Sequence, residues 1–197
     1  MQRILIVAAS LLVAFTGVAS SAEVRLGPEK GLTPVGIPGP AFGTQDAPAV
    51  ASNGHDFLAI WRDQRRGLPV VTPDIYASRI TRDGQPVDRG GRRIAEKVFY
   101  APVIASNGSE YLACYVAGGH LVSQRLDENG VPIAPPTDLG LSMRPLFLRS
   151  NGSGYLFVGG KDLDSLPLTT VLLLDGAGVP QGTVMTLVGR PKAAGAR

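Results

Sequence analysis

One pattern occurs three times along the chain and constrains its fold more than any other feature. The three copies are APAVASNGHDFLAIWR (47–62), APVIASNGSEYLACYV (101–116) and RPLFLRSNGSGYLFVG (144–159). Each contains a proline, then Ser-Asn-Gly, then an aromatic residue followed by leucine, and each is followed by a Gly-x-Pro, at 84–86, 130–132 and 178–180. Pro48, Pro102 and Pro145 correspond, which gives a repeat of 43 to 54 residues. Repeats of this length are typical of solenoids, propellers and other arrays.

Turn residues divide each repeat into strands. Asn-Gly between two apolar runs favours a two-residue type I′ hairpin turn, in which both central residues take positive φ angles. Such turns are predicted at Asn53-Gly54, Asn107-Gly108 and Asn151-Gly152. A third strand, at 75–81 or 121–126, ends at a second turn, and a weaker fourth strand follows, for example at 92–98. No segment after residue 22 shows sustained helical periodicity, so each repeat predicts one antiparallel four-stranded sheet.

The second strand of each repeat, at 57–61, 111–115 and 155–158, is apolar almost without alternation. Such a strand is expected to be buried on both faces, as in a propeller blade that is packed between two neighbouring blades. Closed propellers have four to eight blades. We therefore predict an all-β fold of about three antiparallel, four-stranded, propeller-type blades, forming an incomplete or truncated propeller. A small β-sandwich built from the same hairpins is the alternative.

The repeat resembles the blades of large secreted bacterial β-propeller proteins over residues 44–182. The resemblance is carried by Pro-x-x-x-Ser-Asn-Gly, which has one further residue before the serine in the third copy, by the following [Tyr/Phe]-Leu, and by the closing Asp-Gly-x-Pro or Asn-Gly-x-Pro of the first two copies. Such blades often have Asp-x-Arg after the aromatic strand, and Asp63-Gln64-Arg65 matches it, whereas 116–119 and 158–161 do not. The resemblance implies the architecture but not the function, because propellers serve both binding and catalysis.

The remaining segments complete the predicted organisation. Residues 1–22 combine Arg3, an apolar run and small residues at Ser20 and Ala22, which is the pattern of a secretory signal peptide. We expect a Pro/Gly-rich segment with room for one closing strand at 23–43, repeats at 44–98, 99–140 and 141–188, and an irregular tail at 189–197. After cleavage no membrane anchor is expected, because no second apolar run of spanning length follows. The expected location is secreted or periplasmic.

Charge and cysteine content restrict the classes of partner. The chain has 19 Lys+Arg and 16 Asp+Glu, and a cleaved signal peptide would remove only Arg3. The basic patches at 62–67 and 89–93 fall in predicted loops or strand ends and lack interleaved aromatic residues, so no nucleic-acid partner is expected. Cys114 is the single cysteine, so no intramolecular disulfide can form. It lies in an apolar strand and is predicted to be a buried, inert thiol.

Residues that could carry chemistry are few. His55 and His120 occupy different places in their repeats and no other ligand cluster has metal-binding spacing, so neither a metal nor another cofactor is predicted. No catalytic residue is predicted. Asp63, Arg65 and Arg66 are weak candidates for ligand contact. These residues would favour a hydrolase only if they lay in a pocket with another carboxylate, because glycoside hydrolysis requires a pair of carboxyl groups.

The sequence as a whole favours an exported, non-enzymatic binding or structural repeat module of unknown ligand. The alternative is a degenerate or fragmentary glycan-processing propeller hydrolase, so the question of enzymatic activity stays open. Expected partners are another extracellular protein or a glycan. Because too few blades leave terminal faces uncovered, self-association is also expected.

Overall fold

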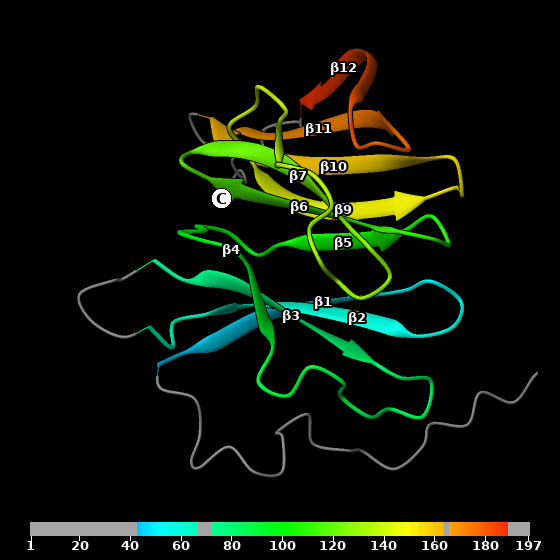
Figure 1. Cartoon of the computed structure of the whole chain (residues 1–197). Helices are drawn as coiled ribbons and strands as arrows, with labels where there is room; N and C mark the ends of the chain where they lie inside the picture. Colours follow the sequence, from blue (N-terminus) through cyan, green and yellow to red (C-terminus); the bar gives the residue numbers. More distant parts are fainter. Residues whose placement is uncertain (1–42, 67–71, 164–165, 189–197) are drawn as a thin grey trace, which may run out of the picture. The chain divides into compact units, whose positions relative to one another are not determined.

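The computed structural model describes residues 43–66, 72–163 and 166–188, which contain twelve β-strands and no helix. The predicted signal peptide (1–22), nearly all of the segment 23–43 and the tail 189–197 lie outside these described residues. The strands form three four-stranded antiparallel sheets, one from each sequence repeat (Figure 1). The predicted all-β fold with three such sheets is confirmed, in place of the two-sheet sandwich considered as its alternative.

Within each sheet the strands are neighbours in chain order. The first sheet contains β1 (Gln45–Ser52), β2 (Phe57–Asp63), β3 (Asp74–Ile80) and β4 (Arg92–Ala95). The second contains β5 (Val103–Ser106), β6 (Tyr111–Ala117), β7 (His120–Leu126) and β8 (Thr137–Asp138). The third contains β9 (Arg144–Ser150), β10 (Gly154–Leu163), β11 (Leu166–Asp175) and β12 (Pro180–Val188).

The first strands of the three sheets contact one another in succession, β1 with β5 and β5 with β9. The sheets therefore follow each other along the chain with their first strands adjacent, as the inner strands of neighbouring blades are in a propeller. Figure 1 shows the second sheet between the first and the third. This arrangement is consistent with an incomplete propeller.

Two apolar layers hold the sheets together, and β6 supplies both. Tyr111, Ala113 and Tyr115 face the first sheet, where they pack in one cluster with Leu58 and Ile60. The intervening Leu112, Cys114 and Val116 face the third sheet and pack with Leu148 and Phe157. Full burial of a leucine side chain contributes about 1.5–3 kcal/mol. The uninterrupted apolar run of β6 is thus explained by two-sided burial, as predicted, and Cys114 is fully buried, also as predicted.

In β10 the prediction of two-sided burial is wrong. Tyr155 and Phe157 are 3 % and 0 % exposed, but Leu156 between them is 38 % exposed. Burial alternates along β10 because one face packs on the second sheet and no sheet of the described residues covers the other face. The apolar run in the sequence has the same form as in β6, but its neighbour on one side is missing.

The Asn-Gly connections are four-residue loops, and the predicted two-residue turns are wrong. Ser52 pairs directly with Phe57 across β1 and β2, and the same spacing separates Ser106 from Tyr111. Only the glycine has a positive φ angle, +101° at Gly108, whereas Asn107 does not. A loop of this length needs positive φ at one position only, so Asn serves a different purpose from the one predicted.

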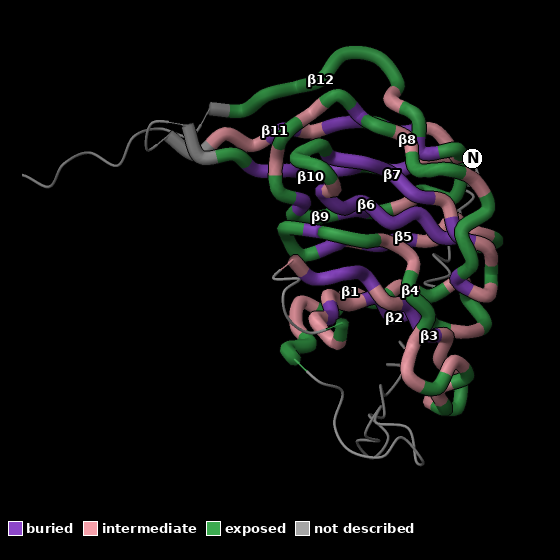
Figure 2. The backbone as a smooth tube through the Cα atoms, turned by 60° about the vertical axis from the view of Figure 1, so that its left-hand side comes forward, coloured by how far each residue is buried: buried purple, intermediate pink, exposed green. Residues whose placement is uncertain are grey.

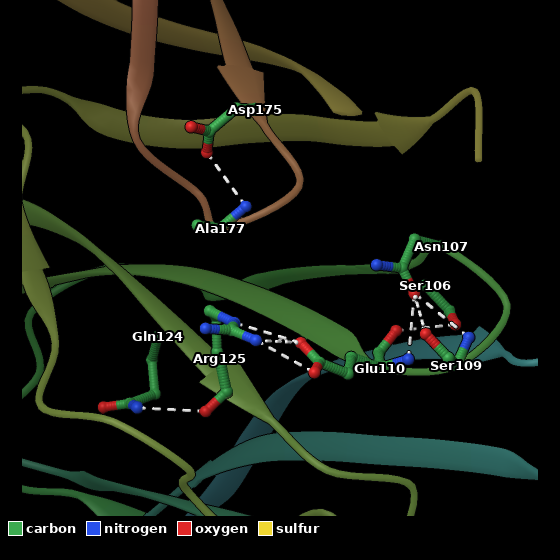
Figure 3. A network of polar contacts seen from close by, with 8 residues as sticks. All are labelled: Ser106, Asn107, Ser109, Glu110, Gln124, Arg125, Asp175 and Ala177. Carbon is green, nitrogen blue, oxygen red and sulfur yellow. Dashed lines mark hydrogen bonds and ion pairs between the residues drawn. The ribbon is translucent and has the colours of Figure 1, made fainter. Parts of the chain in front are cut away.

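That purpose is hydrogen bonding by the asparagine side chain. Asn107 Oδ1 accepts hydrogen bonds from the backbone N–H groups of Ser109 and Glu110 at 3.0 and 2.9 Å (Figure 3). Ser106 Oγ accepts from the Gly108 N–H at 3.0 Å and donates to the Glu110 carbonyl at 2.8 Å. These bonds satisfy loop N–H groups that have no strand partner, as Asx turns do.

Replacing Asn107 by Ala should therefore lower the free energy of unfolding by about 1–2 kcal/mol, because two backbone donors lose their acceptor. Asn107→Asp is the matched control, since its carboxylate keeps an acceptor oxygen in place, and it should stay close to the wild type. Urea denaturation of the two variants measures the difference. Equal losses in both would show that the side-chain oxygen does not hold the loop.

Candidate functional site

The three residues singled out in the sequence lie together at one end of the first sheet. Asp63 is the last residue of β2, and Arg65 and Arg66 follow it. Asp74, the first residue of β3, pairs with Asp63 across the two strands. A second carboxylate, which the sequence did not single out, therefore lies beside the predicted residues.

Asp63 is the centre of a clamp formed within the chain. It is 2 % exposed, and its Oδ2 accepts hydrogen bonds from Trp61 Nε1 and Arg65 Nε, both at 2.9 Å. Its Oδ1 accepts from the Arg65 backbone N–H at 2.8 Å. The Arg65 guanidinium also donates to the Gly90 carbonyl and lies 4.0 Å from the centre of the Tyr76 ring. The Trp-x-Asp-x-Arg pattern thus ties the end of β2 to β3 and to the loop before β4.

Asp74 is held in a similar way by Arg66. The Asp74 side chain is 1 % exposed, and its Oδ1 accepts from Arg66 Nη2 at 2.7 Å and from the Lys97 backbone N–H at 3.2 Å. Its Oδ2 accepts no hydrogen bond of good geometry but lies 2.5 Å from Arg66 Nε in an ion pair. Arg93 Nη1 lies 3.8 Å from the same oxygen and Arg93 Nη2 lies 2.8 Å from Glu96 Oε1.

The charges of this arginine–carboxylate cluster balance within the chain. Its three carboxylates belong to Asp63, Asp74 and Glu96, and its three guanidinium groups belong to Arg65, Arg66 and Arg93. A buried carboxylate requires this kind of compensation, because an unpaired buried charge is strongly unfavourable. The structure thus brings the predicted residues together, and it gives each one a partner from the chain itself.

The pKa values follow from these contacts. Burial alone would raise the pKa of Asp63, but the hydrogen bonds from Arg65 and Trp61 outweigh it, so the pKa lies below its usual value. The hydrogen bond to Asp63 raises the pKa of Arg65, and the hydrogen bond to Asp74 raises that of Arg66. Asp63 is therefore an ionised ion-pair partner near neutral pH and is poorly suited to act as a general acid.

The described residues also carry polar features outside this cluster. In the part of the chain that the structure describes, no three His, Cys, Asp or Glu side chains are placed to hold a metal ion. His120 Nδ1 lies 3.3 Å from Asp138 Oδ2 at the surface. A hollow of about 280 Å³ is lined by Tyr100, Ser142, Met143, Arg144, Gly160 and Lys161. It contains neither Asp63 nor Asp74.

An exposed apolar surface lies on the third sheet, on the side away from the second sheet. Phe147, Val158, Val171 and Met185 are cross-strand partners and form one row across β9, β10, β11 and β12. Leu156 pairs with Leu173 in the next row, and Leu187 lies further along β12. We call these seven residues the outer face. Five of them are strongly exposed, namely Phe147 41 %, Leu156 38 %, Leu173 54 %, Met185 58 % and Leu187 60 %. In Figure 2 the exposed β12 runs along the edge of this sheet.

Comparison of the repeats shows what the outer face lacks. Leu58, Leu112 and Leu156 occupy the same position, five residues after the asparagine of the Ser-Asn-Gly motif. Leu58 and Leu112 are 0 % exposed because the next sheet covers them, whereas Leu156 is 38 % exposed. The outer face is therefore the surface that the first two sheets bury against a following sheet.

The sequence analysis expected terminal faces without a covering blade, and the outer face is such a face. One further difference between the repeats bears on it. Arg79 and Arg125 occupy equivalent places in the third strands of the first two repeats, and the corresponding residue of the third repeat is Leu173. Arg79 Nη1 donates to Asn129 Oδ1 of the next repeat at 2.9 Å, and Arg125 binds Glu110 through Nε and Nη2 at 2.8–3.0 Å (Figure 3). Leu173 thus replaces an arginine, whereas Arg149 lies opposite Leu156 at the position where the first two repeats have Ala51 and Ala105.

Comparisons with protein-family models, with curated proteins and with solved structures each found no match to this chain. Within the described residues, no helix has the length and apolar character needed to cross a membrane.

Replacing Asp63 by Asn should lower the free energy of unfolding at pH 7 by roughly 1.5–3 kcal/mol, the range for a hydrogen bond to a charged group. Because the folded-state pKa is lowered, this stabilisation is present above the unfolded pKa of about 3.9 and is lost as the pH falls through the folded-state value. The difference between wild type and variant should therefore shrink at pH 3.

Denaturant titrations at pH 7 and pH 3 make this measurement. Glu128→Gln is the control, because Glu128 is an exposed carboxylate and its loss should leave stability unchanged at both pH values. A deficit of the same size at pH 3 and pH 7 for Asp63→Asn would contradict a role for the ionised carboxylate.

Proposed function

We propose that the chain is an exported, non-enzymatic interaction module that binds a protein partner through the outer face of the third sheet. The observation that carries this proposal is the exposure of Leu156, at a position that is fully buried in both preceding repeats. An uncovered face of this kind, rich in large apolar side chains, is typical of a protein–protein contact surface.

The chemistry of the face favours a protein over a glycan as the partner. Its centre is the row Phe147, Val158, Val171 and Met185, whose side chains offer no hydrogen-bond donor and only weak acceptors. Arg149 borders this row, with its guanidinium 4.4 Å from the centre of the Phe147 ring. A glycan is recognised through hydrogen bonds to its many hydroxyl groups, which the apolar row does not supply. An apolar surface of another β-sheet matches this face, because the first two sheets already bury the equivalent face in that way.

The arginine–carboxylate cluster supports a structural role for the predicted site residues. Asp63 and Asp74 would be the carboxylate pair of the hydrolase alternative, but both are engaged by arginines of the same chain. Retaining and inverting hydrolysis each require carboxyl groups that can reach the scissile bond. The cluster geometry therefore favours the interaction module, and Arg65 and Arg66 act as internal partners in this proposal.

The proposed location outside the cytoplasm, secreted or periplasmic, is supported by the sequence of residues 1–22. The blade-like repeat, with its resemblance to secreted bacterial propellers, is consistent with it. An exported chain with one cysteine must be held together by packing, and Cys114 lies fully buried in the layer between the second and third sheets.

Binding of the apolar dye ANS in dilute solution, where sedimentation shows the chain to be monomeric, tests whether the outer face is an open binding surface. The native chain should enhance dye fluorescence, and Leu156→Arg should remove most of the enhancement because it replaces an exposed apolar side chain of the face with a charged one. Val131→Arg is the control, since Val131 is an exposed apolar residue outside the outer face.

A native monomer that does not bind the dye would contradict the proposed function. The same conclusion would follow if Leu156→Arg and Val131→Arg reduced the fluorescence equally. Melting curves recorded for each variant distinguish loss of the face from loss of the fold.

A further inference from the structure

The two internal interfaces of this chain share one specific contact. We call the leucine that follows the motif asparagine by five residues, Leu58, Leu112 or Leu156, the exit leucine of its repeat. In each interface, the glycine of the Gly-x-Pro turn of the following repeat lies against the exit leucine of the preceding repeat. A Cβ atom added to Gly130 would lie 2.6 Å from Leu58 Cδ1, and one added to Gly178 would lie 2.6 Å from Leu112 Cδ1. The leucine thus lies against a backbone position where a Cβ atom would push its methyl group aside.

At the two ends of the array the same contact is half complete. Leu156, the exit leucine of the third repeat, is 38 % exposed. Gly84, the turn glycine of the first repeat, is only partly buried, whereas Gly130 and Gly178 are buried. Within the described residues, Leu156 is therefore an exit leucine that no following turn glycine covers, and Gly84 is a turn glycine that follows no other repeat.

Among the described residues, the face of the first sheet that carries its aromatic side chains also has no covering sheet. Tyr111, Tyr115, Val122 and Leu126 are 0–8 % exposed because they pack on the first sheet. Their counterparts in the first repeat are Phe57, Trp61, Tyr76 and Ile80, which we call the entry face. Phe57 is 40 % exposed, and Trp61 and Tyr76 stack with ring centres 6.3 Å apart. The entry face is thus the surface that would pack on a face like the outer face, if another sheet presented one.

We infer that a second copy of this chain supplies the missing partner, with the entry face of one copy packed on the outer face of the other and Gly84 covering Leu156. The inference rests on the proposed function, since it names the occupant of the outer face. Two copies would bring together six sheets, within the four to eight of closed propellers. A heterologous contact of this kind can close into a ring when each copy uses both of its faces.

The alternative of two outer faces packed on each other has no precedent within the chain. Each internal interface joins two unlike faces. One face carries the exit leucine, and the opposite face carries the turn glycine and the aromatic residue. Two outer faces together would place Leu156 opposite apolar side chains, with no turn glycine to receive it. The internal interfaces therefore favour head-to-tail pairing.

Sedimentation equilibrium of the purified chain and three variants tests this inference. The wild type should be a dimer. Leu156→Arg on the outer face and Gly84→Asn on the entry side should each weaken dimerisation at least tenfold. Asn tolerates the positive φ of Gly84, +76°, and adds a side chain where Leu156 must fit. Gly54→Asn is the matched control, because Gly54 also has positive φ, +92°, but has open space around it, and it should dimerise normally.

Mixing the two defective variants gives the decisive result. A Leu156→Arg copy retains a wild-type entry face, and a Gly84→Asn copy retains a wild-type outer face, so together they form one intact interface. The mixture should contain a heterodimer that neither variant forms with itself. Should Gly84→Asn fail to melt cooperatively, Phe57→Arg replaces it as the entry-face variant.

Three results would overturn the inference. One is a wild-type chain that stays monomeric at all concentrations while its outer face binds ANS, an outcome that leaves the proposed function standing. Another is a Gly84→Asn chain, or a Phe57→Arg chain, that dimerises normally while Leu156→Arg does not, which would show two outer faces in contact. The third is wild-type species larger than a dimer, which would show that the pair does not close.

Discussion

The structure depends on the burial of apolar side chains between successive sheets. A four-stranded sheet with two apolar faces is not stable alone in water, because each face must be removed from solvent by a neighbour. β6 shows the fully satisfied case, with Tyr111 and Tyr115 on one side and Leu112 and Val116 on the other, all at most 3 % exposed. Among the described residues, no sheet covers the far side of the third sheet, and Leu156 is 38 % exposed there. The exposure of the outer face follows from this single requirement.

The polar contacts act at the ends of the strands and support this packing. Serine and asparagine side chains satisfy the loop amides at one end of each sheet, as Ser106 and Asn107 do in the second. At the other end of the first sheet, Arg65 and Arg66 neutralise two buried carboxylates that pair across β2 and β3. These contacts fix where strands begin and end. The face-to-face contacts determine which surfaces remain available to a partner.

Most of the fold could be predicted from the sequence, because the relevant signals are local. The repeat of Ser-Asn-Gly and the apolar second strands gave the strand order and the burial of Cys114. The conformation of the Asn-Gly loops was predicted wrongly, because Asn can act through its side chain as well as through a positive φ angle. The exposure of Leu156 could not be read from its repeat, since the same motif is buried at Leu112. It follows instead from the number of repeats, because an array of three sheets leaves its terminal faces uncovered, as the sequence analysis expected. The partnership of Asp63 with Asp74 was missed for a related reason, because it depends on strand register across residues 67–71.

A double-mutant cycle between Leu58 and Gly130 tests the central claim, that the sheets interlock through the leucine and the turn glycine. Leu58→Ala alone leaves a cavity, and Gly130→Ala alone drives a methyl group into Leu58 Cδ1. In the double variant the smaller side chain at 58 makes room for the methyl group, and the strain of alanine at positive φ cancels in the cycle. The account predicts that the double variant is more stable than the sum of the two single losses implies, by about 0.5–3 kcal/mol. Losses that add within about 0.5 kcal/mol would contradict it, because they would show that the two residues do not interact.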